Sequence, residues 1–266
     1  MNTIITHFYN EEYLLPWWIK HHKNLFDNGI MINYASTDRS VKICKEMCPP
    51  HWKIVDSRNE FFEADAVDSE VKDYEATVKG YKMVLNITEF LFTPKSIEDI
   101  IKDYDNKNQL AIRTYGVCMV DNFPDELPSY DKHLFEQKHH GMIRDYQAHD
   151  MNFGMQQNHY NTLFGRMLHN HESFHYIAGR HNTNGMGVDN IFTLKYKFSP
   201  WNEFTQKRIQ QFKSKIPESD ISTSRGTQHL RSEKEYLDEY AGLMQYVKDL
   251  KEDELFLAAY NYCTSL

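Results

Sequence analysis

The chain has 266 residues, with 30 lysines and arginines against 38 aspartates and glutamates, so its formal charge is −8. A content of 41% hydrophobic and 26% charged residues is typical of a globular protein of one or two domains and argues against disorder and coiled coil. The acidic balance argues against nucleic-acid binding, and no apolar run reaches the roughly 18–20 residues of a membrane span. The first residues lack the features of a signal peptide, and four cysteines without paired spacing predict free thiols. We therefore expect a soluble, cytoplasmic protein.

Short apolar strands alternate with amphipathic helices over the first 92 residues. This alternation indicates βαβ units and a mostly parallel sheet, whose ligands bind beyond the carboxyl ends of the strands. The polar segments 9–12, 35–39, 56–58 and 86–89 follow the strands and should therefore meet on one rim. Strands are expected at 3–8, 30–34, 52–55 and 81–85, and helices at 14–26, after a cap at 36–38, and at about 64–79.

The second half is more polar, and its end is helical and charged. Residues 216–228, rich in serine and threonine, are the best linker candidate. We therefore expect a domain at 1–215, with a nucleotide-binding half (1–92) and an acceptor-side half (93–215), and a helical extension at 216–266. The extension should pack on the domain, and its less favoured role is to dock a partner or form a homodimer. Strands are expected as a pair within 109–120 and at 161–171, 174–177 and 192–198, and helices at 201–215, 232–250 and 252–262.

The rim carries residues suited to a nucleotide. An aromatic ring, an amide and a carboxylate follow the first strand, and this chemistry would hold a uracil-type base. Aspartates after the next strands could accept hydrogen bonds from base or ribose, and arginines could bind a diphosphate, because a guanidinium pairs with phosphate in a bidentate way. Each residue alone can also be an ordinary loop or cap residue. The candidates are Tyr9, Asn10, Glu11, Asp38, Arg39, Asp56 and Arg58.

Four motifs in this order resemble one family: residues 8–12 (FYNEE), 36–40 (STDRS), 56–58 (DSR) and 89–91 (EFL). They are similar to the GT-A half of family-2-like glycosyltransferases, in particular a small intracellular subgroup whose first helix carries a Leu-Leu-Pro-Trp-Trp type of sequence. The resemblance covers about residues 3–92 and is weaker over 160–198. It implies an α/β GT-A fold (Rossmann-like, with a mostly parallel central sheet), a nucleotide-diphosphate-sugar donor, a glycan or other hydroxyl acceptor, and inversion at the anomeric carbon.

One departure from the family pattern concerns the metal. Where the family has Asp-x-Asp-Glu-Phe, this chain has Asn86, Thr88 and then Glu89. The family's aspartates hold Mn²⁺ or Mg²⁺, because a hard cation prefers charged oxygen ligands, and Asn86 and Thr88 are neutral. Either Glu89 and a histidine such as His181 hold the metal, or the chain binds its donor without catalysis, or cations replace the metal. The candidate cations are Arg39, Arg58, Lys82 and Lys195.

An inverting transfer also needs a general base to deprotonate the acceptor. Spacing does not separate the five candidates, although Asp150, next to His149, is slightly favoured. The candidates are Asp121, Asp125, Glu126, Asp145 and Asp150.

Nine of the 14 histidines lie between His133 and His181, which raises the alternative of a zinc hydrolase. On a strand, His169, His171 and His175 would face the same side. Against this, no cysteine lies nearby and no H-E-x-x-H motif occurs. A non-catalytic nucleotide- or sugar-binding protein on the same fold is the stronger alternative to a transferase.

Overall fold

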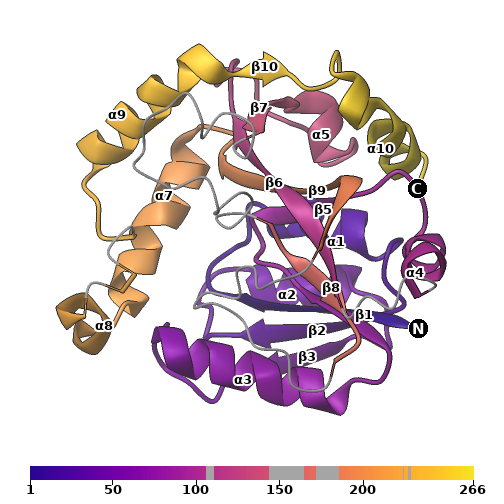
Figure 1. Cartoon of the computed structure of the whole chain (residues 1–266). Coiled ribbons are helices and arrows are strands. Elements are labelled where there is room, and N and C mark those ends of the chain that lie inside the picture. The colour runs from indigo at the N-terminus through magenta and orange to yellow at the C-terminus, as the bar shows by residue number, and fades with distance from the viewer. Residues whose placement is uncertain (106–110, 144–164, 172–185, 224, 227–228) are drawn as a thin grey trace.

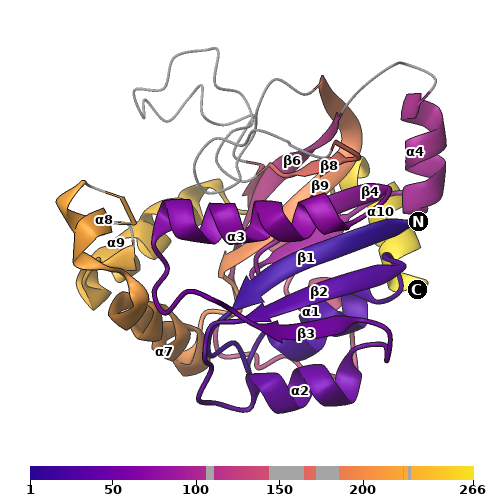
Figure 2. The ribbon, with the colours of Figure 1, turned by 90° about the horizontal axis from the view of Figure 1, so that it is seen from below.

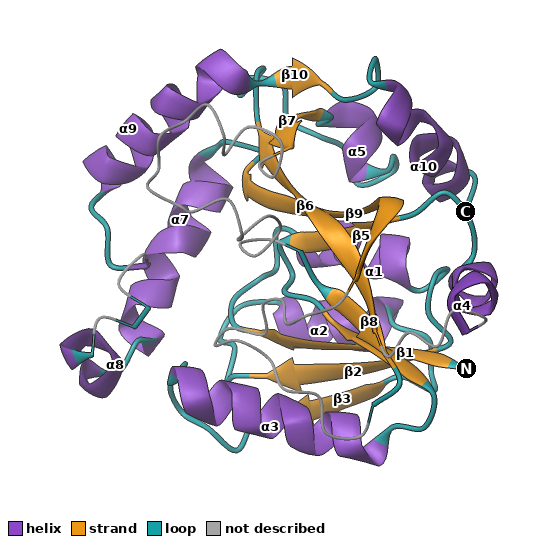
Figure 3. Cartoon of the chain, viewed as in Figure 1, coloured by secondary structure: helices purple, strands orange, loops and turns teal. Residues whose placement is uncertain are grey.

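One mixed sheet runs through the molecule in the computed structural model, which describes residues 1–105, 111–143, 165–171, 186–223, 225–226 and 229–266. Within these residues the strand order is β10-β7-β6-β8-β4-β1-β2-β3, and β9 pairs with both β5 and β6 (Figures 1 and 3). The strands are β1 (Asn2–Phe8), β2 (Asn28–Asn33), β3 (Lys53–Asp56), β4 (Tyr81–Val84), β5 (Glu89–Phe92), β6 (Ala111–Val120), β7 (His140–Ile143), β8 (Met167–His169), β9 (Met186–Phe198) and β10 (Lys248–Asp249).

The half of the sheet formed by β1 to β4 is parallel, as the alternating pattern predicts. Strand β1 pairs in parallel with β2 and β4, and β2 pairs in parallel with β3. Helix α3 (Ala64–Thr77) covers one face of these strands, and α2 (Ser40–Met47) lies on the other (Figure 2). Along β1, Ile4 packs on the side of α1 and α2, whereas Ile5 packs with Val67 and Val71 of α3. Burial of both faces explains why these strands read as short continuous apolar runs.

The other half of the sheet is mostly antiparallel. Strand β8 lies between β4 and β6 and is antiparallel to both, and β7 and β10 extend the sheet by antiparallel pairs. Strand β9 is parallel to β6 and antiparallel to β5. The expected α/β fold is confirmed, with the parallel order confined mainly to its first half.

The helices agree with the prediction best in the first half. Two expectations in the second half are wrong: residues 109–120 contain one described strand, and the helix expected at 232–250 ends at Leu243, because the chain then pairs as β10 with β7. The strand expected at 174–177 lies outside the described residues. The helices are α1 (Leu15–His22), α2, α3, α4 (Ile97–Asp105), α5 (Leu134–Gln137), α7 (Glu203–Phe212), α8 (Glu218–Ser222), α9 (Glu233–Leu243) and α10 (Glu254–Thr264), with 3₁₀ turns at Lys213–Lys215 and Met244–Tyr246.

The C-terminal segment contributes to the main core. Phe256, Ala259 and Cys263 of α10 are buried in the same hydrophobic cluster as Ile4 and Trp18. The ring of Phe256 stacks on Phe192 of β9, with centroids 4.2 Å apart. Residues after 216, expected as an extension, therefore help to form the core of the domain.

Candidate functional site

The loops after β1 and β2 are fastened together by Asn10. This residue has a positive φ of 51°, and its Oδ1 accepts hydrogen bonds from the backbone N–H groups of Thr37 (2.8 Å) and Asp38 (3.3 Å). Its own N–H donates to Ser36 Oγ at 3.1 Å. The expectation that these two strand ends meet on one rim is confirmed. The amide of Asn10 is engaged in holding that rim together.

Asp38 also organises the rim. Its Oδ1 accepts the N–H of Ser40 at 2.9 Å, at the start of α2, and its Oδ2 accepts the N–H of Glu12 at 3.0 Å. Arg39 is exposed, and its Nε donates to Glu12 Oε2 at 3.1 Å. Contact of Asp38 and Arg39 with a nucleotide stays a prediction.

Glu11 forms a buried ion pair with α7. Its carboxylate accepts a bond from Arg208 at 3.1 Å, and Figure 1 shows α7 beside the carboxyl ends of β1 and β2. Burial raises the pKa of Glu11, and the charge of Arg208 offsets part of this rise. Glu11 Oε2 and Arg208 Nε are buried without a hydrogen-bond partner in the described part of the chain. Sequence reasoning missed Arg208, which lies 197 residues from its partner.

An aromatic wall stands beside Tyr9. Its ring lies 6.3 Å from that of Phe62, and the ammonium of Lys215 lies 4.6 Å from its centroid. Phe62 stacks between Tyr34 (4.5 Å) and Phe212 (5.2 Å). Three rings thus back the ring of Tyr9: Tyr34, which directly follows β2, Phe62, from the segment before α3, and Phe212 of α7. Tyr34 and Phe62 are buried.

The segment after β3 is held by a residue that sequence reasoning missed, Glu70 of α3. Its carboxylate accepts bonds from Ser57 Oγ (2.7 Å), the N–H of Arg58 (2.8 Å) and the hydroxyl of Tyr34 (2.9 Å). The guanidinium of Arg58 is exposed and pairs with Asp73 of α3 at 2.6 Å. Asp56 is exposed, and its Oδ1 accepts the side-chain amide of Asn33 at 2.8 Å.

Glu89, at the start of β5, is fully buried among cations. Arg166 donates from Nε to Oε2 (2.8 Å) and from Nη2 to Oε1 (2.6 Å), and Lys195 Nζ lies 3.4 Å from Oε1. Burial alone would raise the pKa of Glu89, but the charges of Arg166 and Lys195 outweigh it and hold the pKa well below its usual range. Asn86 adds bonds from its backbone N–H (2.9 Å) and its side-chain amide (3.3 Å).

This environment does not fit a divalent cation. A carboxylate offers roughly four lone-pair positions, and five donors from Asn86, Arg166 and Lys195 already surround Glu89, so a metal ion would have to displace some of them. Asn86 and the buried Thr88 offer only neutral oxygens. His181, the other predicted ligand, lies outside the described residues.

Basic side chains gather around His229. Its ring is half-buried and stacks on Phe212 at 5.9 Å. Burial, and then the charges of four cations, lower the pKa of His229 to about 4. Two of these cations, Lys197 and Arg231, share the carboxylate of Glu239. Together with Arg166 we call this set the basic cluster: Arg166, Lys195, Lys197, Arg208 and Arg231.

The candidate bases divide into two groups. Asp121 is buried and structural, because its carboxylate accepts bonds from Lys138 Nζ (2.9 Å) and from the N–H of Trp201 (2.9 Å). Asp125 and Glu126 are exposed in the segment after β6. Asp145 and Asp150 lie outside the described residues.

The described histidines give little support to a zinc hydrolase. His169 is buried and bonded to Glu75 at 2.9 Å, and His171 is exposed, while His175 and His181 lie outside the described residues. Elsewhere in the described chain, His139, His140 and Asp249 bring potential ligand atoms within 4.8 Å of one another.

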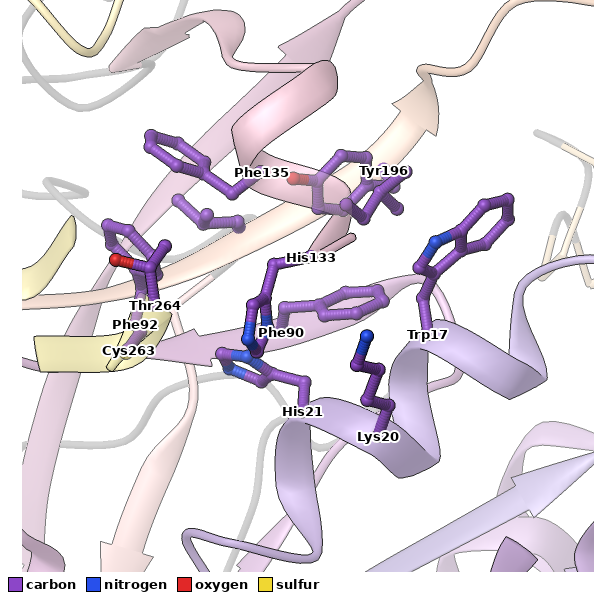
Figure 4. A pocket seen from close by; sticks show the side chains of 12 residues that line it. Trp17, Lys20, His21, Phe90, Phe92, His133, Phe135, Tyr196, Cys263 and Thr264 are labelled. Atoms are coloured by element: carbon purple, nitrogen blue, oxygen red, sulfur yellow. The ribbon is translucent and has the colours of Figure 1, made fainter. Parts of the chain in front are cut away.

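Two cavities differ in size and place. One, shown in Figure 4, lies among Trp17, His21, His133 and Tyr196, away from the strand ends, and its volume of about 10 Å³ admits about one water molecule. The other, which we call the rim pocket, has a volume of about 360 Å³. Its lining joins Asn10, Asp38, Arg39 and Arg208 to Leu127, Pro128 and Tyr130.

Comparison with known proteins gives only distant likenesses. No family model and no curated protein matches the chain, and no helix in the described residues is both long and apolar enough to cross a membrane.

Among solved structures, core-mannan synthase A of Aspergillus fumigatus in its Mn/GDP form is 14% identical over 48% of this chain, with a TM-score of 0.28. A Bacillus anthracis glucose-1-phosphate thymidylyltransferase with bound sucrose is 13% identical over 47% (TM-score 0.30), and mouse xyloside xylosyltransferase 1, apo form, is 13% identical over 65% (TM-score 0.29).

The chain spans 44%, 56% and 68% of these three structures, respectively. Likenesses this distant assign neither an activity nor a substrate. By its strand order and by the helices on both faces of its parallel half, the chain has the α/β fold that the sequence predicts.

Proposed function

We propose that the protein is a glycosyltransferase that moves a sugar from a nucleotide-diphosphate donor to an acceptor hydroxyl, with inversion. The observation that carries the proposal is the basic cluster beside Glu89, just beyond β4. Beyond the carboxyl ends of parallel strands is where α/β proteins bind their ligands, and a diphosphate needs positive charge there. Four free cysteines suit a reducing compartment such as the cytoplasm.

The residues would divide the work of the reaction. Tyr9, backed by the aromatic wall, would hold the nucleoside, and Lys195 with its cationic neighbours would face the diphosphate. When the acceptor oxygen attacks the anomeric carbon, the carbon–oxygen bond to the donor breaks and its electron pair leaves on the nucleoside diphosphate. The cluster would stabilise that charge without a metal ion. An acidic residue such as Asp125, Glu126 or Asp150 would accept the proton of the acceptor hydroxyl.

Titration calorimetry with UDP, GDP and TDP and their sugar conjugates tests the donor site. One nucleotide should bind equally well in EDTA and in Mn²⁺, and Lys195→Met should weaken its binding about 10- to 100-fold, as expected for a lost charge-assisted contact. Lys23→Met, at an exposed lysine that follows α1 and precedes the start of β2, is the matched control. Absence of binding by every nucleotide, or binding only with Mn²⁺, would contradict the proposal.

The neutral Asn86 and Thr88 favour a second candidate, a nucleotide- or sugar-binding protein without catalysis. A nucleotide-release assay with the bound donor and a panel of acceptors separates the two. Turnover that Lys195→Met abolishes supports the transferase. Tight binding without hydrolysis or transfer for any acceptor supports the binding protein.

A further inference from the structure

The rim pocket has walls from three parts of the chain. It is lined by Tyr13, just before α1, by Phe204 of α7, and by Leu127, Pro128 and Tyr130 after β6. Its volume of about 360 Å³ lies within the roughly 300–1,000 Å³ of small-molecule sites. Arg208 lines the pocket and also belongs to the basic cluster. The pocket therefore adjoins the proposed donor site.

Aromatic faces are unusually exposed in the rim pocket. Phe204 and Tyr130 are 45% and 47% exposed, and within the described residues the other large exposed aromatic side chains are Phe61 and Phe123. Phe204 stacks on Tyr13 at 5.1 Å, and Tyr130 lies 4.1 Å from Trp17, so both rings are held in place. Held, exposed rings provide flat apolar surfaces for a ligand at little entropic cost.

Polar side chains with unused hydrogen-bond donors or acceptors lie beside these rings. In the described part of the chain, the side chains of Gln211 and Lys207 make no hydrogen bond, and Glu12 uses only Oε2, for Arg39. The acidic Glu12 and Asp38 balance Arg39 and Lys207, while Arg208 is paired with Glu11. Flat apolar faces with donors and acceptors but no excess charge suit a neutral polyhydroxylated ligand better than a diphosphate.

We propose that the rim pocket binds a neutral saccharide unit of the acceptor, stacked on Phe204 and Tyr130 and hydrogen-bonded by Glu12, Lys207 and Gln211. This inference rests on the proposed transferase function and names the acceptor class as a glycan. Because Arg208 borders both the rim pocket and the basic cluster, the bound saccharide would lie next to the donor diphosphate.

An array of neutral oligosaccharides built from glucose, galactose, mannose and N-acetylglucosamine tests this pocket. Ligand-observed NMR then measures the dissociation constant of the best binder. Phe204→Ala and Tyr130→Ala should each weaken saccharide binding at least tenfold. Phe123→Ala removes an equally exposed ring outside the pocket and should leave binding unchanged. Melting temperatures confirm that the variants fold.

Nucleotide binding by the same variants separates this inference from the donor proposal. Phe204→Ala should bind the nucleotide as the wild type does. No saccharide binding by the wild type, or equal binding by Phe204→Ala and Phe123→Ala, would overturn the pocket assignment while leaving nucleotide binding as a separate test of the donor site. Loss of nucleotide binding in Phe204→Ala would also overturn it, because the pocket would then hold the donor.

Discussion

At the scale of single residues, Glu89 shows how burial changes the role of a carboxylate. The sequence predicts that Glu89 is a metal ligand. In the structure, Arg166 binds both of its carboxylate oxygens and Lys195 lies beside it. Removing one partner of a buried ion pair leaves an uncompensated charge, which costs far more than the pair contributes. The side chain therefore holds the cations in place.

We expect Glu89→Gln to lower the free energy of unfolding by about 3–5 kcal/mol, because Arg166 would keep its charge while buried. Urea unfolding at pH 7 measures the change. Glu46→Gln, at an exposed carboxylate paired with Lys42, should change stability by no more than about 0.5 kcal/mol. Similar losses in both variants would show that the buried pair is not stabilised as described.

At the scale of elements, two histidines of α1 cover the edge of β5 that does not pair with β9. His21 Nε2 donates to the carbonyl of Leu91 at 2.6 Å. His22 Nε2 accepts the N–H of Leu91 at 3.2 Å, so its Nδ1 donates to the carbonyl of Trp18 at 2.9 Å. The imidazole of His22 must be neutral for this arrangement, because its Nε2 accepts a hydrogen bond. Burial lowers the pKa of His21 to about 4 and that of His22 well below its ordinary value.

Acid should therefore loosen the contact between α1 and β5. A group whose pKa is lower in the folded state stabilises the fold above its unfolded pKa of about 6.5, and this contribution is lost as the pH falls toward the folded pKa. We expect each histidine to account for about 2 kcal/mol of lost stability between pH 7 and pH 5.

His22→Gln keeps an acceptor for Leu91 but does not titrate, so its stability should fall about 2 kcal/mol less than that of the wild type over this range. Urea unfolding at both pH values measures the difference, and the exposed His51→Gln serves as the control. Parallel pH dependences of wild type and His22→Gln would refute the role of His22.

At the scale of the whole molecule, the last helix is part of the fold. Phe256 is fully buried, and it stacks on Phe192 within the main core. The composition of residues 216–266, charged and helical, suggests an attached extension. Its apolar face completes the core that the sheet begins.

Phe256→Ala should lower the free energy of unfolding by about 3–5 kcal/mol, because it leaves a cavity between α10 and β9. Denaturant unfolding of the full chain measures this loss. Leu257→Ala, at the next residue, which is 49% exposed, should stay within about 0.5 kcal/mol of the wild type. An equal effect of both changes would mean that α10 is not docked through Phe256.

The sequence by itself determined the elements whose signals are local. Short segments with apolar residues at their centres mark β1 to β4, and polar segments at their ends place the rim, because parallel neighbours bring their carboxyl ends to one edge. The helix start near Ser40 could be predicted in the same way, although the structure places the N-cap of α2 at Arg39 and not within the expected segment 36–38. Such features depend on neighbours in the chain.

Tertiary structure alone decided which charges face one another. Arg166 meets Glu89 across 77 residues, and Arg208 meets Glu11 across 197. Strand β10 is two residues long, and only its pairing with β7 makes this segment a strand. No local pattern encodes such pairs, because an isolated arginine or a short polar run has the same sequence on a solvated surface as in a buried site. The packing of distant elements removes water from these groups, and this desolvation turns ordinary side chains into the basic cluster.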